Sequence, residues 1–190
     1  MNEPPIKIDN RSALIVVDVQ DGFDDATLVG VRDNFEADKN IEAIIKVWER
    51  ANRPIVVVQH NSASEGSILH PSKPGNALKH YVKAIKPALA ITKSVNSAFY
   101  GAPDLDQWLK SSGINQIVII GIQTNMCCET TARMAGNLGY EVIFVPDAMH
   151  TFDSVGPDGV VVTAEELTRA TVASLFDGEF AKIANTADLL

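Results

Sequence analysis

The chain has 190 residues, of which 46% are hydrophobic and 21% charged, the composition of an ordinary globular protein with a sizeable core. Sixteen basic and twenty-four acidic residues give a formal net charge of −8, which argues against nucleic acid or an anionic membrane as the main partner. The chain has two cysteines, Cys127 and Cys128, which are adjacent and therefore cannot form a disulfide framework.

Neither the N-terminus nor the first apolar run indicates a membrane or secretory segment. Met1–Arg11 contains prolines and charges where a signal peptide needs an apolar core. Ala13–Val19 is too short to span a bilayer and contains Asp18. We therefore expect a cytoplasmic protein.

Short apolar runs alternate along the chain with segments of helical spacing. Runs without polar alternation are typical of parallel strands that are buried on both faces. The predicted strands are Ala13–Val17, Ile55–Val58, Leu89–Thr92, Ile117–Ile120, Val142–Val145 and Phe180–Ala184. The predicted helices are Asn34–Asn52, Ala77–Lys83, Leu105–Ser112, Met126–Leu138 and Thr163–Phe176, followed by a tail at Asp188–Leu190.

This alternation predicts one α/β domain over residues 1–190, a doubly wound, Rossmann-like sheet of about six mostly parallel strands with helices on both faces. Right-handed crossovers bring the loops that follow the strands to one edge, where such sheets bind ligands. The residues expected at this edge are Asp18, Gln59, His60, Lys93, Thr124–Cys127 and Asp147.

Three residue types at this edge suit acyl transfer. A cysteine at a helix N-terminus meets free N–H groups and the positive end of the helix dipole, which favour a thiolate. A carboxylate can take the thiol proton, a lysine can stabilise negative charge, and backbone amides can hold an oxyanion. A cysteine in this position is more often a buried packing residue than a nucleophile.

Three separated motifs lie at the predicted strand ends: Asp18–Phe23, Lys93 with Ser97–Phe99, and Gly121–Arg133. These motifs resemble those of the isochorismatase-like cysteine hydrolases, and the similarity continues through Gly139–Val142 and Val145–Ala148. The resemblance therefore covers nearly the whole chain in the right order, and it implies the isochorismatase-like hydrolase fold.

The resemblance also implies a catalytic triad. In this sequence Cys127 would be the nucleophile, Asp18 the base and Lys93 the electrostatic partner. It further implies a cis peptide between Ile122 and Gln123, with the backbone amides of Gln123 and Cys127 forming the oxyanion hole. Cys128, by contrast, begins an apolar row with Ala132, Ala135 and Leu138 and is predicted to pack against the sheet.

The expected function is hydrolysis of a C–N bond, in an amide or ureido compound, through a thioester acyl-enzyme. The alternatives are a vinyl-ether hydrolase of the isochorismatase type and a catalytically silent member that acts as an assembly module. A phosphatase with an Asp-x-Asp motif is disfavoured because Gln20 replaces the second carboxylate. A dinucleotide-binding oxidoreductase is disfavoured because Asp18–Phe23 has a single glycine.

Four further residues are candidates for substrate binding: Gln20, Phe23, His60 and Phe99. Nicotinamidases of this superfamily carry an Asp-x-His metal motif after the second strand, and the corresponding Gln59–Ser62 has no carboxylate. We therefore expect no metal and no cofactor. The expected partners are a small-molecule substrate and further copies of the chain, as a dimer or tetramer. His150, Phe152 and Asp153 are expected in a loop that reaches a neighbouring subunit's site.

Overall fold

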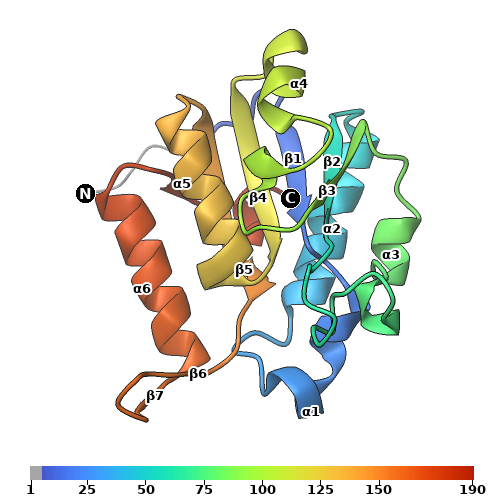
Figure 1. Ribbon diagram of the computed structural model, residues 1–190. Coiled ribbons are helices and arrows are strands. Elements are labelled where there is room, and N and C mark those ends of the chain that lie inside the picture. The colour runs from blue at the N-terminus through green and yellow to red at the C-terminus, as the bar shows by residue number, and fades with distance from the viewer. Residues whose placement is uncertain (1–5) are drawn as a thin grey trace.

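The computed structural model describes residues 6–190, so part of the segment Met1–Arg11 lies outside it. Strands and helices alternate from the N-terminus onward (Figure 1). The strands are β1 (Ala13–Val17), β2 (Ile55–His60), β3 (Leu89–Lys93), β4 (Gln116–Ile122), β5 (Glu141–His150), β6 (Ser154–Val155), β7 (Val161–Val162) and β8 (Lys182–Ile183). The α-helices are α1 (Ala26–Val29), α2 (Ala37–Arg50), α3 (His80–Lys83), α4 (Leu105–Ser111), α5 (Glu129–Asn137) and α6 (Ala164–Asp177).

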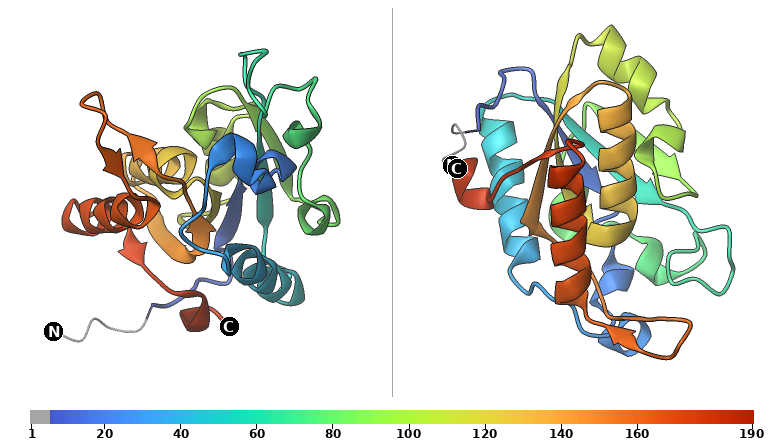
Figure 2. Two further views of the ribbon diagram at one scale, coloured as in Figure 1. Left: turned by 90° about the horizontal axis from the view of Figure 1, so that it is seen from below. Right: turned by 90° about the vertical axis from the view of Figure 1, so that its left-hand side faces the viewer.

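Six of the strands form one sheet in the order β3-β2-β1-β4-β5-β8, and every neighbouring pair is parallel. The order reverses between β1 and β4, so the crossovers place helices on both faces of the sheet, as predicted. Figure 2 shows α2 and α5 on opposite sides of the sheet. The predicted fold class is confirmed.

Alternate residues of the central strands enter two separate cores. On β1, Leu14 and Val16 pack in the core under α2, whereas Ile15 and Val17 pack in the core under α4, α5 and α6. All five residues of β1 are buried, which explains why the strand is apolar throughout instead of alternating. None of the helices within residues 6–190 is long and apolar enough to cross a membrane.

β5 is longer than predicted. It continues past Val145 to His150, and its register against β4 shifts between Ile119 and Gly121. Asp147 therefore lies within a strand and not at the expected strand end. Its carboxylate accepts hydrogen bonds from the backbone N–H and the hydroxyl of Thr186. This contact anchors the C-terminal segment, where Leu189 is buried, so the expected tail is packed.

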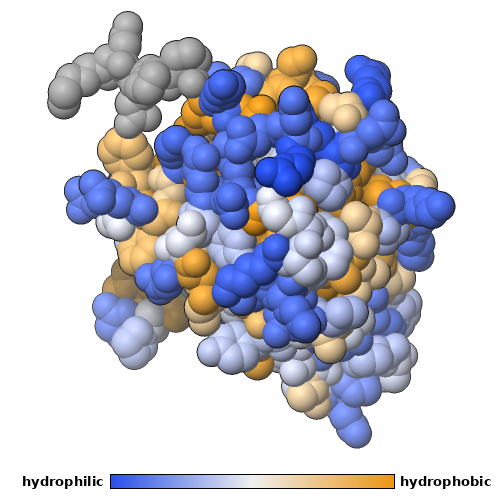
Figure 3. Space-filling view, turned by 90° about the horizontal axis from the view of Figure 1, so that it is seen from above, coloured by the Kyte–Doolittle hydropathy of each residue, from blue (hydrophilic) through white to orange (hydrophobic). Residues whose placement is uncertain are grey.

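The antiparallel hairpin β6–β7 was not expected, because strands of two residues leave no periodic pattern in the sequence. It projects from the edge at which the strands of the six-stranded sheet have their C-terminal ends, below the sheet in Figure 1. The opposite edge is seen in Figure 3, where most of the surface is hydrophilic.

Candidate active site

The ammonium of Lys93 lies at the centre of a cluster built from the ends of separate strands. Its Nζ atom lies 2.6 Å from Oδ2 of Asp18, 3.1 Å from Nδ1 of His60 and 3.3 Å from Sγ of Cys127. The side chains of Asp18 and Lys93 are buried, and that of Cys127 is partly exposed. The structure thus brings together the three residues that the family resemblance singles out, at the predicted edge of the sheet.

A close approach of β1 and β4 fixes two of these residues. Val17 pairs with Gly121, and a Cβ atom at Gly121 would collide with the carbonyl oxygen of Val17. Gly121 also has φ +133°, a conformation that residues with a side chain rarely adopt. Because Asp18 follows Val17 directly, this contact sets how far Asp18 lies from the segment that carries Cys127.

The segment after Gly121 turns sharply before α5 begins. The peptide bond between Ile122 and Gln123 is cis. One turn of π-helix, Thr124–Cys128, follows, and the carbonyl of Gln123 accepts hydrogen bonds from the amides of Met126 and Cys128, both at 3.2 Å. Cys127 therefore lies in a π-turn that precedes α5, and not in the first turn of a regular α-helix as expected.

The electrostatic surroundings of Cys127 also differ from the expectation of a stabilised thiolate. Burial, together with the negative charge of Asp18, raises the pKa of the Cys127 thiol to about 12, although Lys93 acts in the opposite direction. Burial also raises the pKa of Asp18 and outweighs the effect of Lys93. The resting nucleophile is thus a thiol next to the Asp18–Lys93 pair.

One carboxylate oxygen of Asp18 has no hydrogen-bond partner among the residues that the structure describes. Oδ2 accepts from Lys93, whereas Oδ1 is buried without a hydrogen-bond partner. An unpaired buried carboxylate oxygen is costly, and it is a good acceptor for a proton. Asp18 is therefore suited to take the proton of a neighbouring thiol or water.

Asp18, His60 and Cys127 each offer one potential metal ligand, and these three atoms lie within 4.8 Å of one another. Carboxylate, imidazole and thiolate are all zinc ligands. However, Nζ of Lys93 contacts all three side chains, so the group surrounds an ammonium at the place where a metal would sit. His70, in the loop that follows β2, contacts Ser72.

Gln20 is not available to bind substrate. It is fully buried, and its amide group makes hydrogen bonds to the backbone N–H and carbonyl of His60 and to the carbonyl of Asn76. The burial of Gln20 therefore contradicts the expectation that it binds substrate. Its amide instead joins the end of β2 to the loop that follows it.

The two phenylalanines that are candidates for substrate binding, Phe23 and Phe99, each stack on another aromatic ring. Phe23 is buried and stacks on Phe152, with ring centroids 6.1 Å apart. Phe99 is partly buried and stacks on Tyr140, with centroids 5.9 Å apart. Aromatic residues near strand ends are common in cores, and sequence alone does not separate the two roles.

The segment expected to reach a neighbouring subunit is engaged within its own chain. His150 is fully buried in β5, Phe152 belongs to the core, and Asp153 accepts a hydrogen bond from the amide of Ala164 at the start of α6. His150 therefore lies in a strand and not in the expected loop, because β5 ends later than predicted.

A residue that sequence reasoning missed is Asn96, whose Oδ1 lies 3.9 Å from Sγ of Cys127. It lies three residues after Lys93, and that spacing was the available signal. Beside it runs an open groove between the segment after β3 and the outer face of α5, with a volume of about 610 Å³. Its lining residues are Val95, Asn96, Ser97, Tyr100, Thr130, Arg133, Met134 and Asn137.

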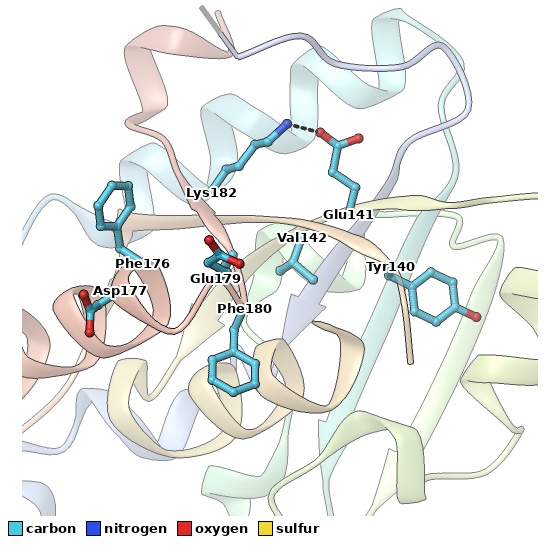
Figure 4. Close-up of a pocket in the computed structure, with 9 residues that line it drawn as sticks. Tyr140, Glu141, Val142, Phe176, Asp177, Glu179, Phe180 and Lys182 are labelled. Carbon is cyan, nitrogen blue, oxygen red and sulfur yellow. Dashed lines mark hydrogen bonds and ion pairs between the residues drawn. The ribbon is translucent and has the colours of Figure 1, made fainter. Parts of the chain in front are cut away.

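A second pocket, of about 480 Å³, lies between the start of β5, the end of α6 and β8 (Figure 4). Within it, Lys182 forms an ion pair with Glu141. It is lined by the first residues of β5, so it lies at the opposite edge of the sheet from Cys127. It has no part in the cluster around Lys93.

Comparison with known proteins places the chain in a family. The family model of the isochorismatase domain matches residues 12–177. The isochorismatase family protein YrdC of Bacillus subtilis is 37% identical over 183 residues, covering 96% of each chain. Nicotinamidase 3 of Arabidopsis thaliana is 27% identical over 180 residues, covering 88% of this chain and 81% of the relative.

Among solved structures, that of a hydrolase of the isochorismatase family from Chromobacterium violaceum superposes with a TM-score of 0.91. It is 29% identical and covers 99% of this chain and 96% of that one. These similarities confirm the resemblance that the sequence motifs indicate.

Proposed function

The chain belongs to the isochorismatase family of hydrolases, and we propose that it is a cysteine-dependent member that cleaves the C–N bond of a small amide or ureido compound. The observation that carries this proposal is the contact of one buried ammonium, that of Lys93, with both the carboxylate of Asp18 and the thiol of Cys127. A vinyl-ether hydrolysis needs no such nucleophile, whereas acyl transfer does.

In the first step Asp18 acts as general base and Cys127 as nucleophile. The carboxylate accepts the thiol proton while Sγ bonds to the carbonyl carbon of the substrate, and the carbonyl electrons move to its oxygen. Because the pKa of the thiol is about 12, proton transfer accompanies the attack and does not precede it. Lys93 stabilises the negative charge that passes between the carboxylate and sulfur.

The tetrahedral adduct then collapses. The C–N bond breaks, the proton held by Asp18 passes to the leaving nitrogen, and a thioester remains on Cys127. Asp18 next accepts a proton from water as the water oxygen attacks the thioester. The C–S bond breaks, sulfur recovers the proton from Asp18, and the acid leaves. Each half of the cycle returns Asp18 to its ionised form.

The developing oxyanion needs donors near Cys127. We assign this role to the backbone amides of Gln123 and Cys127. The carbonyl of Gln123 already accepts from the amides of Met126 and Cys128, the residues on either side of Cys127. This arrangement supports an elbow whose amide directions are set before substrate binds.

The test is an ammonia-release screen of small amides, ureido compounds and nicotinamide, with Cys127→Ala as the matched inactive variant. Release by the wild-type protein and none by Cys127→Ala, together with an acyl adduct on Cys127 detected by mass spectrometry, is the expected result. Equal release by both proteins would refute the role of Cys127.

Two other results would favour the alternatives. Turnover of a vinyl ether without any adduct on Cys127 would favour the isochorismatase-type reaction. No adduct and no turnover over the whole panel would favour a silent member that serves in assembly. The presence of a nicotinamidase among the relatives supports including aromatic amides in the panel.

A further inference from the structure

The ammonium of Lys93 has three hydrogens and faces three acceptors. Two of them, Oδ2 of Asp18 and Sγ of Cys127, belong to the proposed reaction. The third is Nδ1 of His60, at 3.1 Å. An ammonium is a donor of three hydrogen bonds and accepts none, so Nδ1 of His60 must accept.

A ring nitrogen that accepts is unprotonated, and this fixes the state of the imidazole. With Nδ1 free of hydrogen, a neutral ring carries its proton on Nε2. Burial and the charge of Lys93 lower the pKa of His60 to about 4, in agreement with a neutral ring at neutral pH.

The backbone of His60 is held on both sides. Its N–H donates to Oε1 of Gln20 at 2.9 Å, and its carbonyl accepts from Nε2 of Gln20 and from Nδ2 of Asn76, both at 3.0 Å. Gln20 itself is fully buried. These hydrogen bonds fix the main chain of His60 and so limit the positions that its ring can take.

We propose that His60 is a positioning residue that holds the Lys93 ammonium between Asp18 and Cys127 by accepting its third hydrogen bond at Nδ1. Gln20 and Asn76 fix the main chain of His60 so that Nδ1 lies at the required place. Its effect on turnover rests on the proposed function. Its effect on the thiol of Cys127 does not, because the thiol can be measured without substrate.

The first test is the tautomer of His60 in the wild-type protein. Nitrogen-15 NMR of labelled histidine separates the two neutral tautomers and the charged ring, and His60→Asn identifies the signal of His60 among the four histidines. We expect a neutral ring with hydrogen on Nε2 from pH 6 upward. Hydrogen on Nδ1, or a charged ring at pH 7, would overturn the proposal.

The second test is the rate at which iodoacetamide alkylates Cys127, measured against pH. His60→Leu removes the acceptor, whereas the side-chain oxygen of His60→Asn can stand close to Nδ1. We expect alkylation to slow by about tenfold in His60→Leu, the factor for one lost charge-assisted hydrogen bond, and to recover in His60→Asn. His70→Asn, in the exposed loop, is the control and should match the wild type.

These readouts separate the two proposals. Equal alkylation profiles for the wild type and His60→Leu would overturn the role of His60, whatever the substrate screen gives. Slowed alkylation in His60→Leu with rescue in His60→Asn would support that role even if no amide in the panel were hydrolysed. In that case only the proposed function would be refuted, and the role of His60 would stand.

Discussion

The Nζ atom of Lys93 lies 2.6 Å from Oδ2 of Asp18, and neither side chain is more than 1% exposed. Two charges buried together lose their hydration, and their mutual attraction offsets that loss only when both are present. The pair therefore stabilises the fold less than its short distance suggests, but removing one partner leaves the other charge unpaired in the core.

We expect Asp18→Asn and Lys93→Met each to lower the free energy of unfolding by roughly 3–5 kcal/mol, because each leaves an uncompensated buried charge. The double variant should lose less than the sum of the two, since neither charge then remains. Urea unfolding of the four proteins measures this coupling. Additive losses would mean that the two side chains do not interact in the folded protein.

Cys127 and Cys128 should react differently, because Cys128 is fully buried and Cys127 is partly exposed. The native protein is expected to take up one iodoacetamide, on Cys127, and the unfolded protein two. Peptide mass spectrometry locates the label, and native Cys127→Ala should take up none. Labelling of Cys128 first would reverse the assignment.

The pH dependence of that labelling follows from the raised pKa of Cys127, about 12. Below its pKa a thiol gains thiolate tenfold for each unit of pH, so the rate should rise steadily from pH 7 to pH 10. A free cysteine in a model peptide is the reference and levels off near its pKa of about 8.5. A plateau below pH 9 in the protein would contradict the burial of the thiol.

His150 should make the fold sensitive to acid. It is fully buried, neither ring nitrogen has a hydrogen-bond partner among the described residues, and burial with the charges of Arg32 and Lys79 lowers its pKa to about 3. Between pH 6.5 and pH 3 the unfolded chain takes up a proton here and the folded chain does not, so stability falls as pH falls through this window.

The matching variant is His150→Phe, which keeps the edge contact with the ring of Phe152 and has no polar atoms. At pH 7 its stability should equal or exceed that of the wild type. Between pH 7 and pH 5 the free energy of unfolding of the wild type should fall by about 2 kcal/mol more than that of the variant. The reason is that pH 5 lies about 1.5 units below the pKa of a free histidine. Equal losses, in urea titrations at both pH values, would show that His150 is not buried in its neutral form.

Gly121 should tolerate no side chain. Gly121→Ala places Cβ against the carbonyl of Val17, so we expect failure to fold, or loss of selective Cys127 labelling if the protein folds. Gly139→Ala is the matched control, because Gly139 also has positive φ, +89°, but has open space around it. In that variant the free energy of unfolding, measured with heat or urea, should fall by only about 1–2 kcal/mol. Similar behaviour of the two variants would rule out the β1–β4 contact as the cause.

Much of the fold could be predicted from the sequence because the strands are buried on both faces. A short, β-branched apolar run such as Ala13–Val17 is typical of a strand buried on both faces, and its alternation with helices favours a parallel sheet. The end of β5 was missed because Pro146 and Asp147 resemble a strand-ending turn. In the structure Asp147 is satisfied by Thr186, a contact 39 residues away in the chain that no local pattern contains.

The site was predictable in position and less so in detail. Asp18, Lys93 and Cys127 follow from motifs, and the structure brings them together. The roles of Gln20, Phe23 and His60 depend on which neighbours lie within 3–6 Å, and those neighbours come from distant segments. The raised pKa of Cys127 was not foreseen because it comes from burial and from the charge of Asp18, and both are properties of the assembled fold.

The arrangement of the strands also has a kinetic consequence. Asp18 and Lys93 are 75 residues apart in the chain, and β2 and β1 must align before β3 can bring Lys93 to Asp18. Contacts of such long sequence separation form late, because the chain entropy lost in closing the loop must first be recovered elsewhere. The selective reactivity of Cys127 should therefore return in refolding only after the sheet has assembled. A chain trapped before β3 joins the sheet would lack the buried charge pair.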